Sequence, residues 1–300
     1  MKKAGFIGIG IMGKPMALNL LNAGVSLAVY DVNESAVNAV TAAGAESVQP
    51  KDMGGACDIV FTILPNGDIV EDVLFGEQGL ASGLKKGSLV VDMSSVTPVQ
   101  SKMCAKRLRE AGCGFIDSPV SGGEPGAVNG TLAFMAGGEE EDFKKAKPYF
   151  DIMGSSALLI GPNGSGSVTK LANQIIVNLN IAAVSEALVL ATKAGADPQL
   201  VYEAIRGGLA GSTVLDAKAP MMISRNFRPG GKISINHKDI KNVMATAHEI
   251  GVPLPFTAQL YEVMQTLKVG GHMGDDHSGI VQYFEQLAGV VVKRPEEVQR

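Results

Sequence analysis

Cysteine is scarce in this sequence, and clusters of basic residues are missing from it. The three cysteines, Cys57, Cys104 and Cys113, are far apart, and no pair has C-x-x-C spacing. An odd number of widely spaced cysteines argues against a disulfide framework or a zinc site, and it fits a reducing cytosol. A net charge of −4 without a basic block argues against nucleic acid as a partner.

A secretory signal pattern is also missing at the start. The first apolar run is only a few residues long and leads directly into a glycine-rich turn, which is not the pattern of a signal peptide. We therefore expect a cytoplasmic protein. Apolar residues are plentiful, at 46% of the chain, and 300 residues suffice for one large domain or two ordinary ones with a sizeable core.

Three glycines, Gly8, Gly10 and Gly13, stand at G-x-G-x-x-G spacing after an apolar run of strand length. Helical apolar spacing follows, and then a second expected strand over 26–31. In such a unit the glycines allow a tight turn and let a pyrophosphate approach the helix N-terminus. Asp31 ends the second strand, at the spacing typical of a ribose-binding carboxylate. We predict a dinucleotide site; the alternative is a glycine-rich helix entry without a ligand.

Strand and helix patterns alternate up to about residue 163 and then give way to helical patterns alone. This predicts an α/β fold, with a doubly wound Rossmann-type domain over 1–163 and an all-α domain over 164–300. A long apolar helix over 166–195 is expected to join them and to be buried, and it favours a homodimer or homotetramer. Asn173 and Gln174 within this helix argue against a transmembrane span.

Two further stretches carry chemically useful residues. Residues 117–132, DSPVSGGEPGAVNGTL, follow an expected strand, and their backbone N–H groups could bind a carboxylate, although an ordinary turn fits equally well. Lys170 lies on the long helix, with Asn173 and Gln174 three and four residues later on its face. Most helix lysines are solvated. On a helix this apolar, however, we expect a desolvated amine with a lowered pKa that exchanges a proton with a carbonyl oxygen.

Together these motifs resemble those of the β-hydroxyacid dehydrogenase family, and the resemblance covers the whole chain. GFIGIGIMGKPMALNL is similar to the cofactor signature, DSPVSGGEPGAVNGTL to the substrate-loop signature, and GSGSVTKLANQ to the catalytic-lysine signature. KLANQIIVNLNIAAVSEALVLATKAG and IRGGLAGSTVLDAKAPMM resemble the branch that reduces tartronate semialdehyde to D-glycerate. Asn173-Gln174 also favours that branch, because the 3-hydroxyisobutyrate branch typically has two asparagines there.

The resemblance implies an oxidoreductase with a nicotinamide cofactor and a small semialdehyde or hydroxy-acid substrate. Lys170 would be the general acid, supported by an amide from Asn173 or Gln174. The implied substrate-binding residues are Ser121, Gly122, Gly123 and Gln174. The implied cofactor-binding residues are Gly8, Gly10, Met12, Gly13, Asp31, Leu64, Pro65, Ser95 and Lys238. No metal is implied.

The expected cofactor is NAD(H), with NADP(H) as the alternative. Asp31 would repel a 2′-phosphate, and neither Val32 nor Asn33 offers a cation to pair with one. Within the same family, a 3-hydroxyisobutyrate dehydrogenase or a glyoxylate/succinic semialdehyde reductase remains open. Outside this chemistry, two possibilities are a dinucleotide-binding module without catalysis and an enzyme for a phosphate-bearing substrate. HMGDDHSG (272–279) contains metal-ligand types, but Asp276 or Ser278 is expected to cap a helix there.

Overall fold

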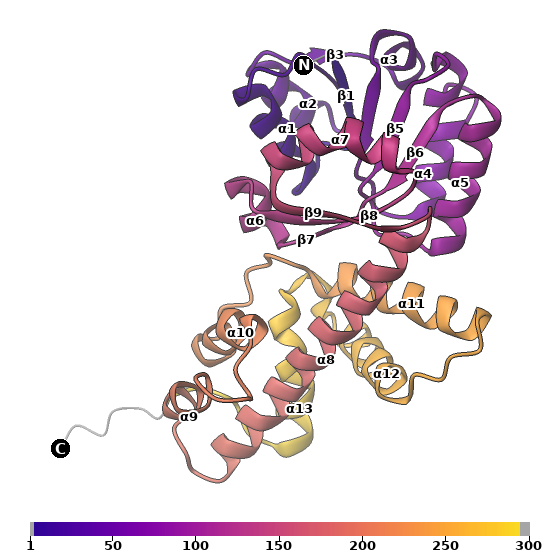
Figure 1. The fold of residues 1–300 in the computed structure, drawn as a ribbon. Helices are drawn as coiled ribbons and strands as arrows, with labels where there is room; N and C mark the ends of the chain where they lie inside the picture. The colour runs from indigo at the N-terminus through magenta and orange to yellow at the C-terminus, as the bar shows by residue number, and fades with distance from the viewer. Residues whose placement is uncertain (1–2, 295–300) are drawn as a thin grey trace. The chain divides into compact units, whose positions relative to one another are not determined.

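The computed structural model describes residues 3–294. The chain divides into two compact units, Met1–Lys170 and Leu171–Arg300. Figure 1 shows the strands and helices of the first unit in indigo to magenta, and most helices of the second in orange to yellow. The expected fold class is confirmed: a Rossmann-type sheet precedes a helical unit.

The first unit is built on a nine-stranded sheet in the order β3-β2-β1-β4-β5-β6-β8-β7, with β9 paired to β8. Strands β1 to β6 pair in parallel in the 3-2-1-4-5-6 order typical of dinucleotide-binding folds. β8 is antiparallel to β6 and β7. The strand bounds are β1 Ala4–Ile7, β2 Leu27–Tyr30, β3 Glu46–Ser47, β4 Ile59–Thr62, β5 Leu89–Asp92, β6 Gly114–Asp117, β7 Val120–Ser121, β8 Leu132–Gly137 and β9 Gly154–Gly161.

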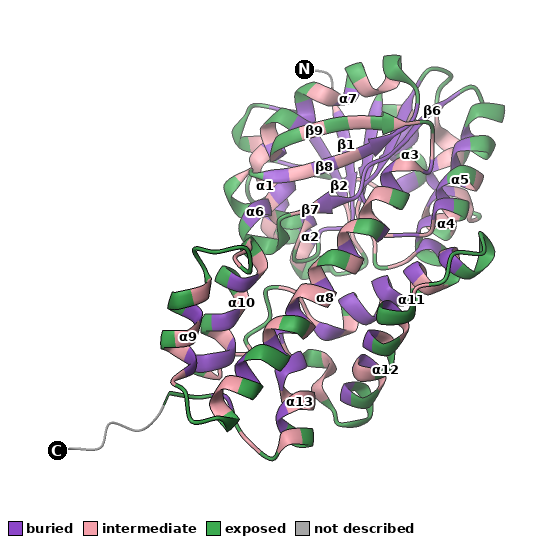
Figure 2. Cartoon of the chain, turned by 60° about the horizontal axis from the view of Figure 1, so that its bottom comes forward, coloured by how far each residue is buried: buried purple, intermediate pink, exposed green. Residues whose placement is uncertain are grey.

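Helices cover both faces of this sheet, because alternate strand residues point to opposite sides and both sets are apolar. Phe6 and Phe61 belong to one buried cluster, whereas Ile7 and Val60 belong to the other. Figure 2 shows the central strands in the colour of buried residues, whereas β9 is drawn as intermediate and exposed. The helices of this unit are α1 Gly13–Asn22, α2 Glu34–Thr41, α3 Pro50–Ala56, α4 Gly67–Phe75, α5 Pro98–Glu110, α6 Gly123–Asn129 and α7 Glu140–Met153, with a 3-10 turn at Leu80–Gly83.

Local sequence signals explain where several helices begin. Thr97 caps α5 in a reciprocal capping box with Gln100, and a proline follows at the first helical position. Asn66 accepts a backbone hydrogen bond at the start of α4 in the same way. One prediction was incomplete: residues 117–132 are not a plain loop, because β7 and α6 form within them.

In its described part the second unit consists of helices and 3-10 turns around one apolar cluster. The long helix α8, Ser165–Lys193, begins in the first unit and continues into the second. The remaining helices are α9 Pro198–Ile205, α10 Thr213–Ser224, α11 Ile233–Glu249, α12 Pro255–Val269 and α13 Val281–Ala288, with 3-10 turns at His272–Gly274 and His277–Ile280. Asp276 caps the second of these turns, directly before α13.

The expectation that α8 is buried all round was wrong. Its buried face includes the polar residues Gln174, Asn178 and Ser185, whereas Ile176 and Leu190 are 62% and 72% exposed. The other second-unit helices cover only one side of α8, and amides line part of that side. Among the described residues α8 is the one helix long and apolar enough to cross a membrane, but the core helix of a soluble protein meets the same criterion.

Candidate functional site

The candidate residues of the first unit gather at one edge of the sheet. The glycine turn follows β1, Asp31 follows β2, Leu64 and Pro65 follow β4, and Ser95 follows β5. Because β1 to β6 are parallel, their carboxyl ends meet at this edge, which is where open α/β sheets bind ligands. The segment that follows β6 carries Ser121 to the same edge.

The three glycines of the turn have different structural duties. Gly8 has φ +99°, and a Cβ there would lie 2.2 Å from the Ile63 carbonyl oxygen. A Cβ on Gly13 would lie 1.8 Å from the Gly8 carbonyl oxygen, so both positions require glycine for packing. A Cβ on Gly10 would meet nothing within 4 Å. The fold itself therefore does not require glycine at position 10. Because no side chain stands there, the space beside the turn is open.

The start of α1 fits an anion beside that open space. Met12 stands at the N-cap of α1 without a side-chain cap, and the first turn has no acidic residue. No carboxylate of the first turn therefore competes with a ligand for the first N–H groups of the helix. A pyrophosphate site needs these N–H groups to be available. Met12 itself is partly buried against the core.

Asp31 ties the glycine turn to the end of β2. Its Oδ2 accepts a hydrogen bond of 2.6 Å from the backbone N–H of Ile9, and its Oδ1 accepts one of 2.8 Å from the N–H of Asn33. The Asn33 side chain in turn caps α2. Asp31 thus has a structural duty that its spacing alone did not reveal. Val32 beside it is 88% exposed.

A buried carboxylate organises the ends of β4 and β5. Asp92 accepts hydrogen bonds from the Thr62 hydroxyl and from both the N–H and the hydroxyl of Ser94. The Ser94 hydroxyl also accepts a 2.8 Å bond from the N–H of Leu64. Ser94, which precedes the predicted Ser95, therefore fixes the position of Leu64. The family resemblance implied Ser95 and not Ser94, so this serine was not predicted.

Lys170 meets the segment that precedes the glycine pair. Its Nζ donates a hydrogen bond of 2.9 Å to the backbone carbonyl of Val120. Ser121 is the next residue, and Gly122 and Gly123 follow with φ values of +133° and +60°. These two glycines turn the chain sharply into α6. The structure thus brings Lys170 to the segment DSPVSGG from 50 residues away.

In the second unit, Gln174 and Lys238 are joined through an aspartate that was not predicted. Asp239 is 2% exposed and accepts a 2.6 Å bond from the Gln174 amide and a 2.9 Å contact from the Lys238 ammonium. The same Gln174 amide donates to Asn236, while its carbonyl accepts from Asn173. This network is a buried polar cluster whose members hold one another in place.

A sequence signal for this network exists in α11. Asn236 and Asp239 share the buried face of this helix with the apolar residues Ile233, Ile240 and Val243. Polar residues at core positions of an amphipathic helix need partners, so their spacing could have marked them.

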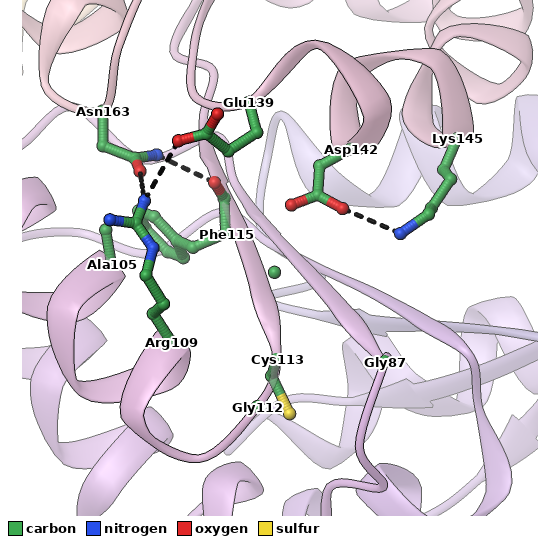
Figure 3. A pocket seen from close by; sticks show the side chains of 11 residues that line it. Gly87, Ala105, Arg109, Gly112, Cys113, Phe115, Glu139, Asp142, Lys145 and Asn163 are labelled. Atoms are coloured by element: carbon green, nitrogen blue, oxygen red, sulfur yellow. Dashed lines mark hydrogen bonds and ion pairs between the residues drawn. The ribbon is translucent and has the colours of Figure 1, made fainter.

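A cavity of about 300 Å³ in the first unit lies away from these residues. Residues of α5, α7 and the start of β6 contribute to its walls, and none of the predicted site residues is among those that line it. Figure 3 shows the Arg109 guanidinium between Glu139 and Asn163, at 3.3 Å and 3.2 Å, and a separate Asp142–Lys145 pair. Its charged groups are engaged with one another, so this cavity is not the candidate site.

Within residues 3–294 no group of three His, Cys, Asp or Glu side chains is placed to hold a metal ion. In the stretch 272–279, Asp276 is fully buried and accepts hydrogen bonds from Ser278, Gly230 and Gly231 as well as Lys218. Hydrogen bonding and the neighbouring cations lower its pKa despite its burial. Asp276 is therefore a structural centre of the second unit.

Two family models match the chain. One, the NAD binding domain of 6-phosphogluconate dehydrogenase, matches residues 3–161. The other, described as NAD-binding of NADP-dependent 3-hydroxyisobutyrate dehydrogenase, matches residues 164–284. The predicted nicotinamide dinucleotide-binding domain is thereby confirmed.

Similar proteins span nearly the whole chain. The 2-hydroxy-3-oxopropionate reductase of Escherichia coli (strain K12) is 45% identical over 287 residues, 95% of this chain and 98% of that protein. The 2-(hydroxymethyl)glutarate dehydrogenase of Eubacterium barkeri is 39% identical over 292 residues, 97% of each. The solved 3-hydroxyisobutyrate dehydrogenase of Mycobacterium tuberculosis with L-serine has a TM-score of 0.88 and 25% identity, covering 95% of this chain and 99% of that one. The names of these proteins refer to different substrates.

Proposed function

The chain belongs to the β-hydroxyacid dehydrogenase family, and from this premise we propose that it reduces tartronate semialdehyde (2-hydroxy-3-oxopropanoate) to D-glycerate. The class, an NAD(P)-dependent β-hydroxyacid dehydrogenase, follows from the family. The choice of substrate is supported by the E. coli relative, which is named for this reaction and is 45% identical to this chain.

The contact between Lys170 and the Val120 carbonyl carries the proposed mechanism. It holds the amine next to Ser121, at the carboxyl end of the sheet. When bound, the reduced nicotinamide supplies a hydride to the aldehyde carbon. The Lys170 ammonium donates a proton to the aldehyde oxygen, so that the aldehyde, one hydride and one proton together form the alcohol.

The residues beside Lys170 would hold the part of the substrate that does not react. We assign the substrate carboxylate to the Ser121 hydroxyl and to the backbone N–H groups of Gly122 and Gly123. Their positive φ values turn the backbone sharply at this point, which favours N–H groups that converge on an anion. Gln174 is the corresponding candidate from the second unit.

Asn173 is the better candidate to support Lys170. The Gln174 amide oxygen, which is the atom that could accept from an ammonium, already accepts from Asn173, and the Gln174 nitrogen donates to Asp239 and Asn236. Asn173 lies three residues after Lys170 on the same helix. We therefore assign Asn173 to the lysine, with Gln174 kept in its orientation by Asp239.

The cofactor residues follow from the sheet edge. The open space at Gly10 and the uncapped start of α1, between Met12 and Gly13, would hold the pyrophosphate. Asp31 would bind the ribose with its remaining lone pairs, and Leu64, Pro65 and Ser95 would line the path to the nicotinamide. Lys238 is assigned to the cofactor from the second unit. We propose NADH as the preferred donor because Asp31 would repel a 2′-phosphate and no cation follows it directly.

Replacement of the lysine tests the mechanism. Lys170→Ala should lower kcat by roughly 10²–10⁴ and leave NADH affinity within a factor of about three. Lys193→Ala serves as the matched control, because this lysine is exposed at the end of the same helix. Normal kcat in Lys170→Ala, measured by NADH oxidation, would remove the amine from the reaction.

A direct comparison of substrates tests the specificity. The kcat/KM for tartronate semialdehyde should exceed the values for methylmalonate semialdehyde, glyoxylate and succinic semialdehyde by at least about tenfold, which is a difference of about 1.4 kcal/mol. The second candidate function is a 3-hydroxyisobutyrate dehydrogenase, which the structural similarity to the M. tuberculosis enzyme favours. A higher kcat/KM for methylmalonate semialdehyde would select it.

We also propose a homodimer or homotetramer in the cytoplasm. The uncovered stripe of α8 supports self-association, because Ile176, Ala183 and Leu190 are exposed at seven-residue spacing on one helix face. Sedimentation velocity on the wild type and on Ile176→Glu/Leu190→Glu tests this proposal. A wild type that sediments as a monomer would contradict it. The three free, buried cysteines are consistent with a reducing compartment.

A further inference from the structure

At Gly166 the first turn of α8 packs closely against backbone atoms of the sheet. A Cβ on Gly166 would lie 2.3 Å from the Met135 carbonyl oxygen and 2.4 Å from that of Asp117. A Cβ on Gly137 would come within 2.8 Å of the Gly166 backbone nitrogen. The start of the helix therefore rests directly on the ends of β6 and β8. Small movements of these strands would be transmitted to it.

Asp117 supplies the cap that this helix lacks locally. Gly164 precedes α8 and has no side chain, and the first turn contains no acidic residue. The Asp117 carboxylate fills that role from 47 residues away in sequence: Oδ1 accepts a 2.7 Å bond from the N–H of Gly164, and Oδ2 accepts a 2.9 Å bond from the N–H of Ser167. These are among the N–H groups that the helix itself cannot satisfy.

Two weaker restraints hold the same turn. The hydroxyls of Ser101, on α5, and Ser167 share a buried hydrogen bond of 2.8 Å. The Asn163 amide donates to the carbonyl of Phe115 at 2.8 Å (Figure 3) and to that of Gly137 at 3.2 Å. Neither restraint carries a charge, so the carboxylate is the strongest acceptor at the start of the helix.

The carboxylate is held at an energetic cost. Asp117 is 1% exposed, and burial raises its pKa to about 6, although the two N–H bonds lower it; the charge of Asp92 nearby raises it further. An asparagine of nearly the same size would avoid the burial of a charge. What the carboxylate provides in return is a strong bond to each of two helix N–H groups, which an amide cannot reproduce.

Lys170 lies on α8 just after the turn that is bound to Asp117. The carbonyl that accepts the Lys170 hydrogen bond lies just after Asp117 in the chain. Val120, whose carbonyl receives the Lys170 amine, lies three residues after Asp117 on the same segment. We propose that Asp117 is a positioning residue that clamps the first turn of α8 to the end of β6 and thereby sets the place of the Lys170 amine beside Ser121. The inference rests on the proposed function only in so far as Lys170 acts in catalysis.

Asp117→Asn and Asp117→Ser in the full-length protein test the clamp. Both substitutions remove the charge. The variant with the smaller serine is measured in parallel, so that the test can still be made if one of the two variants fails to fold. Ser118→Ala is the matched control, because Ser118 is fully buried on the same segment and its hydroxyl has no hydrogen-bond partner among the described residues. The readouts are Tm, hydrogen–deuterium exchange over 160–170, the rate of reductive methylation of Lys170, and steady-state kinetics.

In the Asp117 variants we expect exchange at the start of α8 to be at least about tenfold faster than in wild type. Lys170 should be methylated at least about threefold faster, because its amine is less well held. The kcat should fall by about 10- to 100-fold, with the KM for the aldehyde and the Kd for NADH within about threefold, since a displaced acid affects the chemical step. Tm should be no lower than in wild type.

Three results would count against the clamp. Exchange and methylation rates equal to those of Ser118→Ala would show that Asp117 does not anchor the helix. A loosened helix with unchanged kcat, in a protein where Lys170→Ala is inactive, would show that the place of the amine does not depend on Asp117. A Tm well below wild type would indicate a purely structural residue. If Lys170→Ala is itself active, the proposed mechanism fails, and the exchange and methylation rates alone decide on the clamp.

Discussion

Replacement of Gly10 by alanine should separate cofactor binding from folding. The backbone at Gly10 is not in the positive-φ region, and an added Cβ would meet no atom within 4 Å. Alanine there should stabilise the protein by about 0.4–1 kcal/mol, because it restricts the unfolded chain. The same methyl group would occupy the space assigned to the pyrophosphate. Overpacking of this kind costs about 1–3 kcal/mol, which corresponds to a roughly 5- to 150-fold higher Kd for NADH.

Gly13→Ala is the contrasting variant. Its Cβ would lie 1.8 Å from the Gly8 carbonyl oxygen, so the turn must move, and stability should fall by about 1–3 kcal/mol or more. Thermal unfolding without cofactor and fluorescence titration with NADH measure both quantities. If Gly10→Ala keeps the wild-type Tm and binds NADH within about twofold of wild type, the turn does not face the pyrophosphate. A clearly lower Tm in Gly10→Ala would instead refute the open space at this position.

Further predictions concern the substrate segment, cofactor choice, pH and thiol chemistry. Ser121→Ala should raise the KM for the aldehyde by about 5- to 30-fold, which corresponds to a loss of about 1–2 kcal/mol, with little change in kcat; an unchanged KM for every hydroxy acid tested would remove this serine from the site. Val32→Arg should shift kcat/KM toward NADPH while Asp31 keeps its bonds to the backbone, and a wild type that already prefers NADPH by about tenfold would contradict the argument from Asp31. The pKa of Asp117 is about 6 in the folded protein against an ordinary value of 3.8, so the folded state binds more protons in that window and stability decreases as pH rises through it. Denaturant titrations should show that the free energy of unfolding of the wild type falls by up to about 3 kcal/mol relative to that of Asp117→Asn between about pH 4 and pH 6. Parallel plots of unfolding free energy against pH for the two proteins would refute this. Burial raises the thiol pKa of Cys57 to about 11 and that of Cys104 to about 12, so both should resist alkylation at about pH 8 until the protein is unfolded; rapid labelling of the native protein would show that they are accessible.

The sequence by itself determined the elements that depend on short-range chemistry. The glycine spacing after β1 and the acid after β2 are recorded in one short stretch of sequence, so their pattern was sufficient to locate them, although Asp31 and Gly8 also contact residues farther away in the chain. Alternation of strands and helices was likewise sufficient for the Rossmann-type class, since parallel strands need crossover helices. Lys170 could be selected as a candidate because it interrupts an otherwise apolar helix.

Only the tertiary structure decided how the candidates are held. Asp117 reaches the N–H groups of α8 across 47 and 50 residues, and Gln174 reaches Asp239 across 65. No local pattern records such partners, because they depend on which strand ends and helix faces the fold brings together. The same holds for Gly10, which differs from Gly8 and Gly13 because no neighbouring atom lies within 4 Å of the place that a Cβ would take. Burial of one face of α8 was also decided by its packing partners, since an apolar composition cannot specify which side the other helices cover.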